Sequence, residues 1–294
     1  MLAATGLVCA TLTALPGKAD AARDAVAQPV VGQALFDDFN YAGYTDPQLT
    51  QHGWTLKSGQ GGPGVTGATW RPSYITFTTE SGGNSLMTLR AGSSGTASTT
   101  SESEIHTQRK FFRGTYAARV RFSDTPAAGP DGDHMVQTFF TISPLNFPLD
   151  PDYSELDFEY LPNGGWGIPS SALLATSWET YSDTQEVNIS TQERAGFDGW
   201  HDLVITVDTA SVNYYIDGRL FASHGEPYLP ETSMDIRFNH WLIDLLGTTS
   251  KRSRSYEETV DYVYHLKDQV LTPTEVQGVV DDYRARGVTF EDTV

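Results

Sequence analysis

The stretch Ser154-Glu155-Leu156-Asp157-Phe158-Glu159-Tyr160 alternates three carboxylic acids with three apolar side chains. A period of two is typical of a β-strand, whose successive side chains point to opposite faces. The acids would then share one face and the apolar row the other. A solvated strand face shows the same alternation, but three like charges on one face repel one another. Because crowded carboxyls separate the pKa values of neighbouring acids, the stretch is also a candidate catalytic strand.

The rest of the chain predicts an all-β fold. Short segments with β-strand patterns are separated by Gly, Pro, Asn and Asp, which is typical of a two-sheet β-sandwich or jelly roll. One such domain can accommodate all of residues 29–294. The expected strands besides the one above are 35–39, 74–78, 85–90, 104–107, 114–122, 135–142, 173–178, 200–207, 212–216 and 234–242.

A helix is predicted only near the C-terminus, over about residues 272–287. Thr272-Pro273-Thr274-Glu275 combines an N-cap, a proline in the first turn and the glutamate of a capping box. Apolar residues then recur at helical spacing, and Gly287 would end the helix. We expect this short helix to pack on the outside of the sandwich.

Composition limits the partners and the compartment. The formal net charge of −18 makes nucleic acid and anionic membranes poor partners, because both bind Lys and Arg. Residues 1–28 resemble a secretory signal peptide followed by an Ala-rich leader, and their apolar run is too short to span a bilayer. The only cysteine, Cys9, lies in this segment. We therefore expect a secreted, extracellular, disulfide-free monomer with no membrane attachment after cleavage.

Paired carboxylates suggest glycoside hydrolysis. This reaction uses one protonated and one ionised carboxyl group on either side of the scissile bond, about 5–5.5 Å apart in a retaining enzyme. On a straight strand the Cα atoms of Glu155 and Glu159 would be roughly 13 Å apart. The strand must therefore bend, and the concave face of a curved sheet would also provide a cleft for a polymeric sugar.

The motif Glu155-Leu156-Asp157-Phe158-Glu159 resembles the E-x-D-x-E signature of glycoside hydrolase family 16, the β-jelly-roll endo-glucanases and lichenase-like enzymes with a concanavalin A-like sandwich. The resemblance extends from about residue 36 to residue 266, because further segments follow in the family's order. These segments are Glu104-Ile105-His106-Thr107, 114–119, Phe139-Phe140, Trp200-His201, 214–218, Asn239-His240-Trp241 and Asp261-Tyr262-Val263.

This resemblance implies a retaining double displacement. Glu155 would be the nucleophile, Glu159 the general acid and then base, and Asp157 would tune both. The electrostatics agree, because ionised Glu155 and Asp157 would raise the pKa of Glu159 and keep its proton near neutral pH.

Sugar rings stack on aromatic side chains and hydrogen-bond through their hydroxyl groups, so a glycan cleft should contain both kinds of residue. Arg237, Asn239 and Trp241 share one face of the strand 234–242, which by resemblance lines the cleft. Further candidates for substrate binding, for which a core or rim position is equally consistent, are Glu104, Trp178 and Tyr214.

Two positions refine the expected substrate and metal. No extra residue separates Asp157 from Glu159, whereas laminarinase-like members often carry a bulge there, and this disfavours a laminarinase-type substrate. Asp261 matches the aspartate with which family members hold a structural Ca²⁺. No other cofactor is expected.

The sequence thus predicts a secreted retaining endo-glycosidase acting on a β-linked polysaccharide, with a β-1,3/1,4-glucan as the first choice. A transglycosylase on the same fold is one alternative. A non-catalytic, lectin-like glycan-binding protein is another, although a binder gains nothing from a desolvated cluster of like charges.

Overall fold

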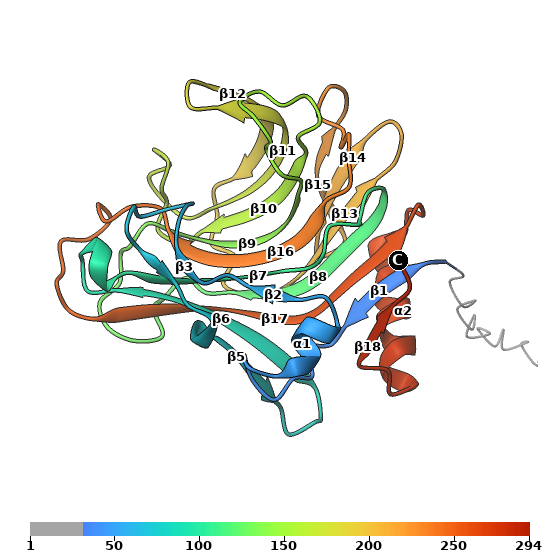
Figure 1. The fold of residues 1–294 in the computed structure, drawn as a ribbon, viewed down its shortest axis with the longest axis horizontal. Helices are drawn as coiled ribbons and strands as arrows, with labels where there is room; N and C mark the ends of the chain where they lie inside the picture. Colours follow the sequence, from blue (N-terminus) through green and yellow to red (C-terminus); the bar gives the residue numbers. More distant parts are fainter. Residues whose placement is uncertain (1–31) are drawn as a thin grey trace, which may run out of the picture.

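The alternating stretch forms strand β10 (Glu155–Leu161) near the middle of a curved antiparallel sheet (Figure 1). The computed structural model describes residues 32–294, so the predicted leader and Cys9 lie outside the described residues. In this concave sheet β10 pairs with β9 and β11 without a register shift over residues 155–160. The order is β2 (Thr55–Leu56), β7 (Ser101–His106), β16 (Asp235–Leu242), β9 (Met135–Ile142), β10, β11 (Ala172–Ser182) and β12 (Gln185–Glu193).

A second antiparallel sheet covers the convex side of the first. Its order is β5 (Ile75–Thr79), β6 (Ser85–Ser93), β17 (Arg254–Lys267), β8 (Gly114–Phe122), β13 (Gly199–Val207), β14 (Val212–Ile216) and β15 (Arg219–His224). Strand β1 (Ala34–Asp37) pairs with the end of β17, and β18 (Phe290–Asp292) pairs with β1. The short strand β4 (Thr69–Trp70) pairs with β7, β3 (Gly59–Gln60) pairs with β4, and α1 (Pro47–Gln51) precedes β2. The predicted two-sheet jelly-roll architecture is therefore confirmed.

The apolar row of β10 faces the core between the sheets. Leu156, Phe158 and Tyr160 are at most 1 % exposed. Phe158 meets Tyr214 of the second sheet edge to face at 5.3 Å between ring centroids, and Tyr160 lies 5.0 Å from Phe122. Burial of each large apolar side chain contributes about 1.5–3 kcal/mol. This packing fixes the opposite, acidic row of β10 on the concave face.

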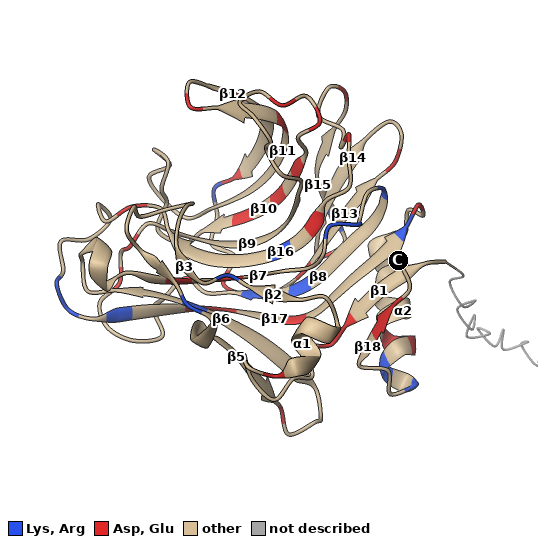
Figure 2. Ribbon diagram, viewed as in Figure 1, with Lys and Arg blue, Asp and Glu red and all other residues tan. Residues whose placement is uncertain are grey.

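Helix α2 (Pro273–Ala285) confirms the prediction for the C-terminus. Thr272 accepts a hydrogen bond from the backbone N–H of Glu275, whose side chain completes the capping box. The helix packs on the outer face of the second sheet, where Tyr283 stacks on Phe36 with ring centroids 4.5 Å apart. Within residues 32–294, no helix has the length and apolar character needed to cross a membrane. Acidic positions are spread over both sheets and outnumber basic ones (Figure 2).

Candidate active site

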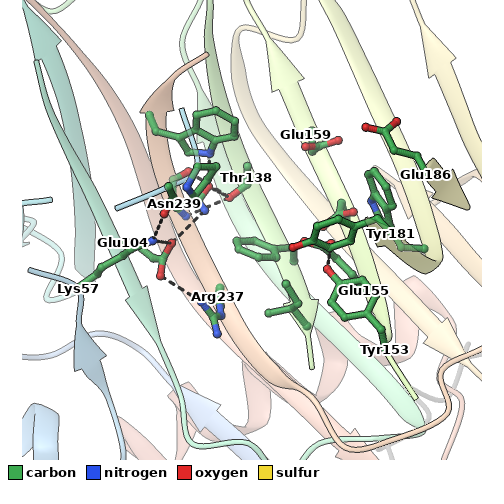
Figure 3. A pocket seen from close by; sticks show the side chains of 17 residues that line it. Lys57, Glu104, Thr138, Tyr153, Glu155, Glu159, Tyr181, Glu186, Arg237 and Asn239 are labelled. Atoms are coloured by element: carbon green, nitrogen blue, oxygen red, sulfur yellow. Dashed lines mark hydrogen bonds and ion pairs between the residues drawn. The ribbon is translucent and has the colours of Figure 1, made fainter. Parts of the chain in front are cut away.

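The concave face holds a cavity of about 520 Å³ whose lining includes all three acids of β10 (Figure 3). Its walls come from β7, β16, β9, β10, β11 and β12, from the loops after β2 and β3, and from the segment before β10. The bend of the sheet around this cavity is visible in Figure 1. The structure brings five of the six predicted substrate-binding residues to the cavity, namely Glu104, Trp178, Arg237, Asn239 and Trp241.

Tyr214 is the exception, and its predicted place in the cleft is corrected. It lies on β14 in the second sheet, is fully buried between the sheets, and its hydroxyl donates to the carbonyl of Thr176 at 2.8 Å. Alternation correctly groups Tyr214 with Val212 and Ile216 on one face, but in this sheet that face is the core. Tyr214 therefore supports the strand β11 from behind and does not line the cavity.

The three acids of β10 differ in how strongly they hold a proton. Burial is the largest cause for each. It raises the pKa of Glu155 to about 7, where hydrogen bonds and the charge of Arg237 oppose it. Burial together with the charge of Glu155 raises the pKa of Glu159 to about 8. Near neutral pH, Glu159 therefore holds its proton more firmly than Glu155 does.

The electrostatics of Asp157 differ from the expectation that it shares its charge with Glu155. It is only 4 % exposed, and one of its carboxyl oxygens has no hydrogen-bond partner within the described residues. Burial and the two flanking glutamates raise the pKa of Asp157 well above its usual range. The charge that raises the pKa of Glu159 thus comes from Glu155 and not from Asp157.

A polar network covers the opposite wall of the cavity, on β7 and β16. Glu104 forms ion pairs with Lys57 and Arg237 at 3.3 and 3.2 Å, and Arg237 also binds Asp235 through both carboxylate oxygens. Asn239 donates to Glu104 at 3.3 Å. Both cations that line the cavity are therefore already paired with carboxylates.

Thr138 links this network to β10. It lies directly opposite Glu159 in the β9–β10 ladder. On the other side of Thr138, the pairing of β9 with β16 is interrupted at Asn239. There the Thr138 hydroxyl donates to the side-chain carbonyl of Asn239 at 2.7 Å and accepts from the Asn239 backbone N–H at 3.0 Å. Trp241 donates its indole N–H to the same Asn239 carbonyl at 2.9 Å. The floor of the cavity is thus fixed by hydrogen bonds.

Aromatic side chains line the cavity on both sides of β10. Trp241 on β16 lies beside Trp166, an exposed residue of the loop after β10, with ring centroids 5.8 Å apart. On β11, Trp178 lies opposite Glu155 and contacts Tyr181 edge to face at 5.9 Å. Hydrogen-bonding groups between aromatic faces are the combination that sugar rings require.

Sequence reasoning missed several residues that line the cavity, Thr138 among them. Tyr153 has the same strand parity as Glu155, so extending the alternation by one step would have found it. Lys57 and Glu186 lie in segments with little strand pattern, and Tyr181 lies beyond the end of a predicted strand. Only the tertiary fold brings these three residues to the cavity.

The surroundings of Asp261 do not fit the expected Ca²⁺. Its carboxylate accepts from Arg284 at 2.7 Å and from Asn84 at 2.8 Å, and Arg119 lies 3.7 Å away. Calcium takes six to eight oxygen ligands, whereas two guanidinium groups face this carboxylate. Across residues 32–294 no group of three or more His, Cys, Asp or Glu is arranged to hold a metal ion.

Neither the protein-family models nor the curated protein sequences contain a match to the chain. Solved structures do match. The β-glucanase of Bacillus licheniformis aligns with a TM-score of 0.57 and 19 % identity over 81 % of this chain and all of that one. A glycoside hydrolase family 16 endo-glucanase from Bacteroides ovatus aligns with a TM-score of 0.60 and 16 % identity over 79 % of this chain and 99 % of that one. A laminarinase from Flavobacterium sp. UMI-01 aligns with a TM-score of 0.56 and 13 % identity over 79 % of this chain and 98 % of that one.

The chain has the fold of these glycoside hydrolases. At such low identity the match establishes the architecture, while the chemistry must be argued from the residues in the cleft.

Proposed function

We propose that the protein is a retaining endo-glycosidase that hydrolyses internal bonds of a neutral β-linked polysaccharide. The observation that carries the proposal is the acidic row of β10, which lines a cavity and contains an acid that retains its proton beside one that loses it more readily. The fold of glycosidases around that row supports the same reaction class.

The residues define the steps. Glu159 donates its proton to the glycosidic oxygen while ionised Glu155 attacks the anomeric carbon, which requires their carboxyl groups to lie about 5–5.5 Å apart. A covalent glycosyl-enzyme forms and the leaving sugar departs with the proton. Esterification removes the charge of Glu155, so the pKa of Glu159 falls and its carboxylate can deprotonate a water molecule. That water releases the sugar with retained configuration and restores Glu155.

A β-1,3/1,4-glucan is the proposed substrate. Such a glucan is neutral, and the cations of the cleft, Lys57 and Arg237, are already paired and so do not call for an anionic sugar. The uninterrupted register of β10 favours a lichenase-type cleft over the laminarinase type in the family resemblance. A solved structure with a TM-score of 0.59 is described as a family 16 protein of a mixed-linkage glucan system. We further propose that the protein is secreted by its leader and acts as a monomer.

Replacement of the nucleophile tests this function. Glu155→Gln keeps the size of the side chain but cannot form the glycosyl-enzyme, so hydrolysis of barley β-glucan should fall on the order of 10⁴-fold or more. Its thermal unfolding should remain close to that of the wild type. Glu257→Gln, on the second sheet and outside the cavity, is the matched control and should retain full activity. Release of reducing ends by Glu155→Gln would disprove the assignment.

The same assay separates the alternatives. Transfer of glycosyl units to an added acceptor sugar in preference to water would identify a transglycosylase. Binding of glycan by the wild type with no reducing ends released from any β-glucan would identify a lectin-like protein.

A further inference from the structure

Tyr153 lies two residues before Glu155 and shares its face of the strand (Figure 3). The residue is 1 % exposed, although its side chain lines the cavity. Its ring packs edge to face on Tyr181, with centroids 5.2 Å apart and an interplanar angle of 81°. Tyr153 is therefore held in one orientation by its neighbours.

The backbone around Tyr153 is held as well. Its N–H donates to the carbonyl of Asp150 at 3.2 Å. The following residue, Ser154, forms two hydrogen bonds with Ser143 across the loop, one through each backbone group of Ser154. The phenol is consequently presented by a fixed turn, and little entropy is lost when it makes a contact in the cavity.

That contact is a hydrogen bond from the Tyr153 hydroxyl to Oε2 of Glu155. The tyrosine is the donor, because burial and the charge of Glu155 raise the pKa of Tyr153 far above its ordinary value. A donor on a carboxylate favours the ionised form, and here it opposes the burial that raises the pKa of Glu155. Hydrogen bonds to charged groups are among the stronger ones in proteins.

We propose that Tyr153 is a positioning residue for the nucleophile: its hydroxyl keeps Glu155 ionised and directs the other carboxyl oxygen, Oε1, toward the anomeric carbon. This inference rests on the proposed function. Oε1 forms the new bond to carbon while Oε2 becomes the carbonyl oxygen of the ester and continues to accept from Tyr153. The hydroxyl keeps its proton throughout, so Glu159 alone exchanges protons with the substrate and water.

Tyr153→Phe isolates this role, because it removes the hydroxyl and keeps the ring. Without the donor the ionised form of Glu155 loses stabilisation, so the lower macroscopic pKa of the carboxyl cluster should rise. The acidic limb of the pH profile of kcat/KM should shift to higher pH by about one unit, with about a tenfold loss of kcat/KM at pH values below the limb. A role confined to folding would lower activity at every pH and leave the limb in place.

Tyr181→Phe is the matched control. Tyr181 belongs to the same aromatic wall, but its contacts with Tyr153 and Trp178 are ring contacts, which phenylalanine preserves. Its acidic limb should stay at the wild-type position. An equal shift in both variants would contradict a specific role for the Tyr153 hydroxyl.

A substrate-free measurement separates this inference from the proposed function. A ¹³C NMR titration of the carboxyl groups, with Glu155 assigned through Glu155→Gln, should show Glu155 titrating at higher pH in Tyr153→Phe than in the wild type. Identical titrations would overturn the inference even if the enzyme hydrolyses glucan. A raised titration in a protein that hydrolyses no glycan would support the hydrogen bond and overturn the proposed function. Circular dichroism of both variants verifies that the fold is retained.

Discussion

His265 lies on β17 with its ring fully buried between those of Phe111 and Tyr116, whose centroids are 5.0 and 4.4 Å away. Such surroundings favour the neutral imidazole, and burial lowers the pKa of His265 to about 3. His240 on β16 is equally enclosed, and burial lowers its pKa to about 3 as well. The folded protein thus contains two histidines that resist protonation.

These histidines predict a loss of stability in acid. The unfolded chain binds a proton at each histidine below about pH 6.5, whereas the folded protein does so only near pH 3. Stability should therefore fall as the pH drops through this window, by up to about 1.4 kcal/mol per pH unit for each histidine. His265→Leu should reduce the difference between free energies of unfolding measured in urea at pH 7 and pH 4.

The carboxyl groups titrate in the same range, so the comparison must be made between variant and wild type at each pH. Burial holds the pKa of Glu258, whose carboxyl lies 3.7 Å from the His240 ring, well above its usual range. An unchanged pH dependence in His265→Leu would show that the imidazole is protonated inside the fold.

At the scale of elements, helix α2 is tied to the sandwich by Arg284. Its guanidinium reaches Asp38 at 2.6 Å and Asp261 at 2.7 Å, and lies 5.5 Å from the ring of Tyr262. Asp38 follows β1 and Asp261 belongs to β17, so one side chain joins the helix to both strands. In this chain an arginine occupies the position beside Asp261 where the family resemblance led us to expect a calcium ion.

Arg284→Met tests this ionic contact. The substitution keeps much of the aliphatic volume but removes the cation that pairs with Asp38 and the closer of the two guanidinium groups at Asp261, so the protein should lose about 1–3 kcal/mol of stability. Arg286→Met, at the C-cap of the same helix, breaks an exposed pair with Asp282 and a contact with the ring of Tyr283 at 4.9 Å, and should cost less stability than Arg284→Met does. Chelation with EDTA should leave the wild-type melting temperature unchanged. A drop restored by Ca²⁺ would contradict the pairing described here.

The elements that sequence predicted well carry their signal locally. The alternation of β10 and the capping box of α2 can each be recognised within a few residues. Strand β12 was missed because its apolar period of two is limited to Val187 and Ile189, and no residue of the strand is fully buried. Tyr214 was misplaced for a different reason. The pattern of β14 shows which residues share a face, but the sheet that a strand joins depends on distant pairing, here with β13 and β15.

At the scale of the whole molecule, the two sheets have different roles. The second sheet and α2 provide a rigid convex support, while the curvature of the first sheet gathers residues from β7, β16, β9, β10, β11 and β12 around one cavity. Sequence patterns identified the acids on a single strand. They could not identify Lys57 and Glu186, which reach the same cavity from elements more than a hundred residues apart.

Charge at this scale predicts the substrate class. The chain carries a formal net charge of −18, and the cavity adds Glu104 and Glu186 to the acids of β10, against two cations that are already paired. A sulfated or uronate-containing chain would therefore be repelled on approach and would find no free cation on arrival. Barley β-glucan should be hydrolysed at least a hundredfold faster than carrageenan or polygalacturonate, because repulsion between like charges costs the anionic chains several kcal/mol of binding free energy.

Salt provides the internal control for this charge effect. Between about 10 mM and 1 M ionic strength the Debye length falls from about 30 to 3 Å, so repulsion of an anionic chain should weaken while a neutral chain is unaffected. Values of kcat/KM for β-glucan should accordingly stay nearly constant across this range, measured by reducing-end release, and any residual cleavage of carrageenan should increase. Rapid cleavage of carrageenan at low salt would mean that Lys57 or Arg237 leaves Glu104 to bind the substrate, because no other cation lines the cavity within the described residues.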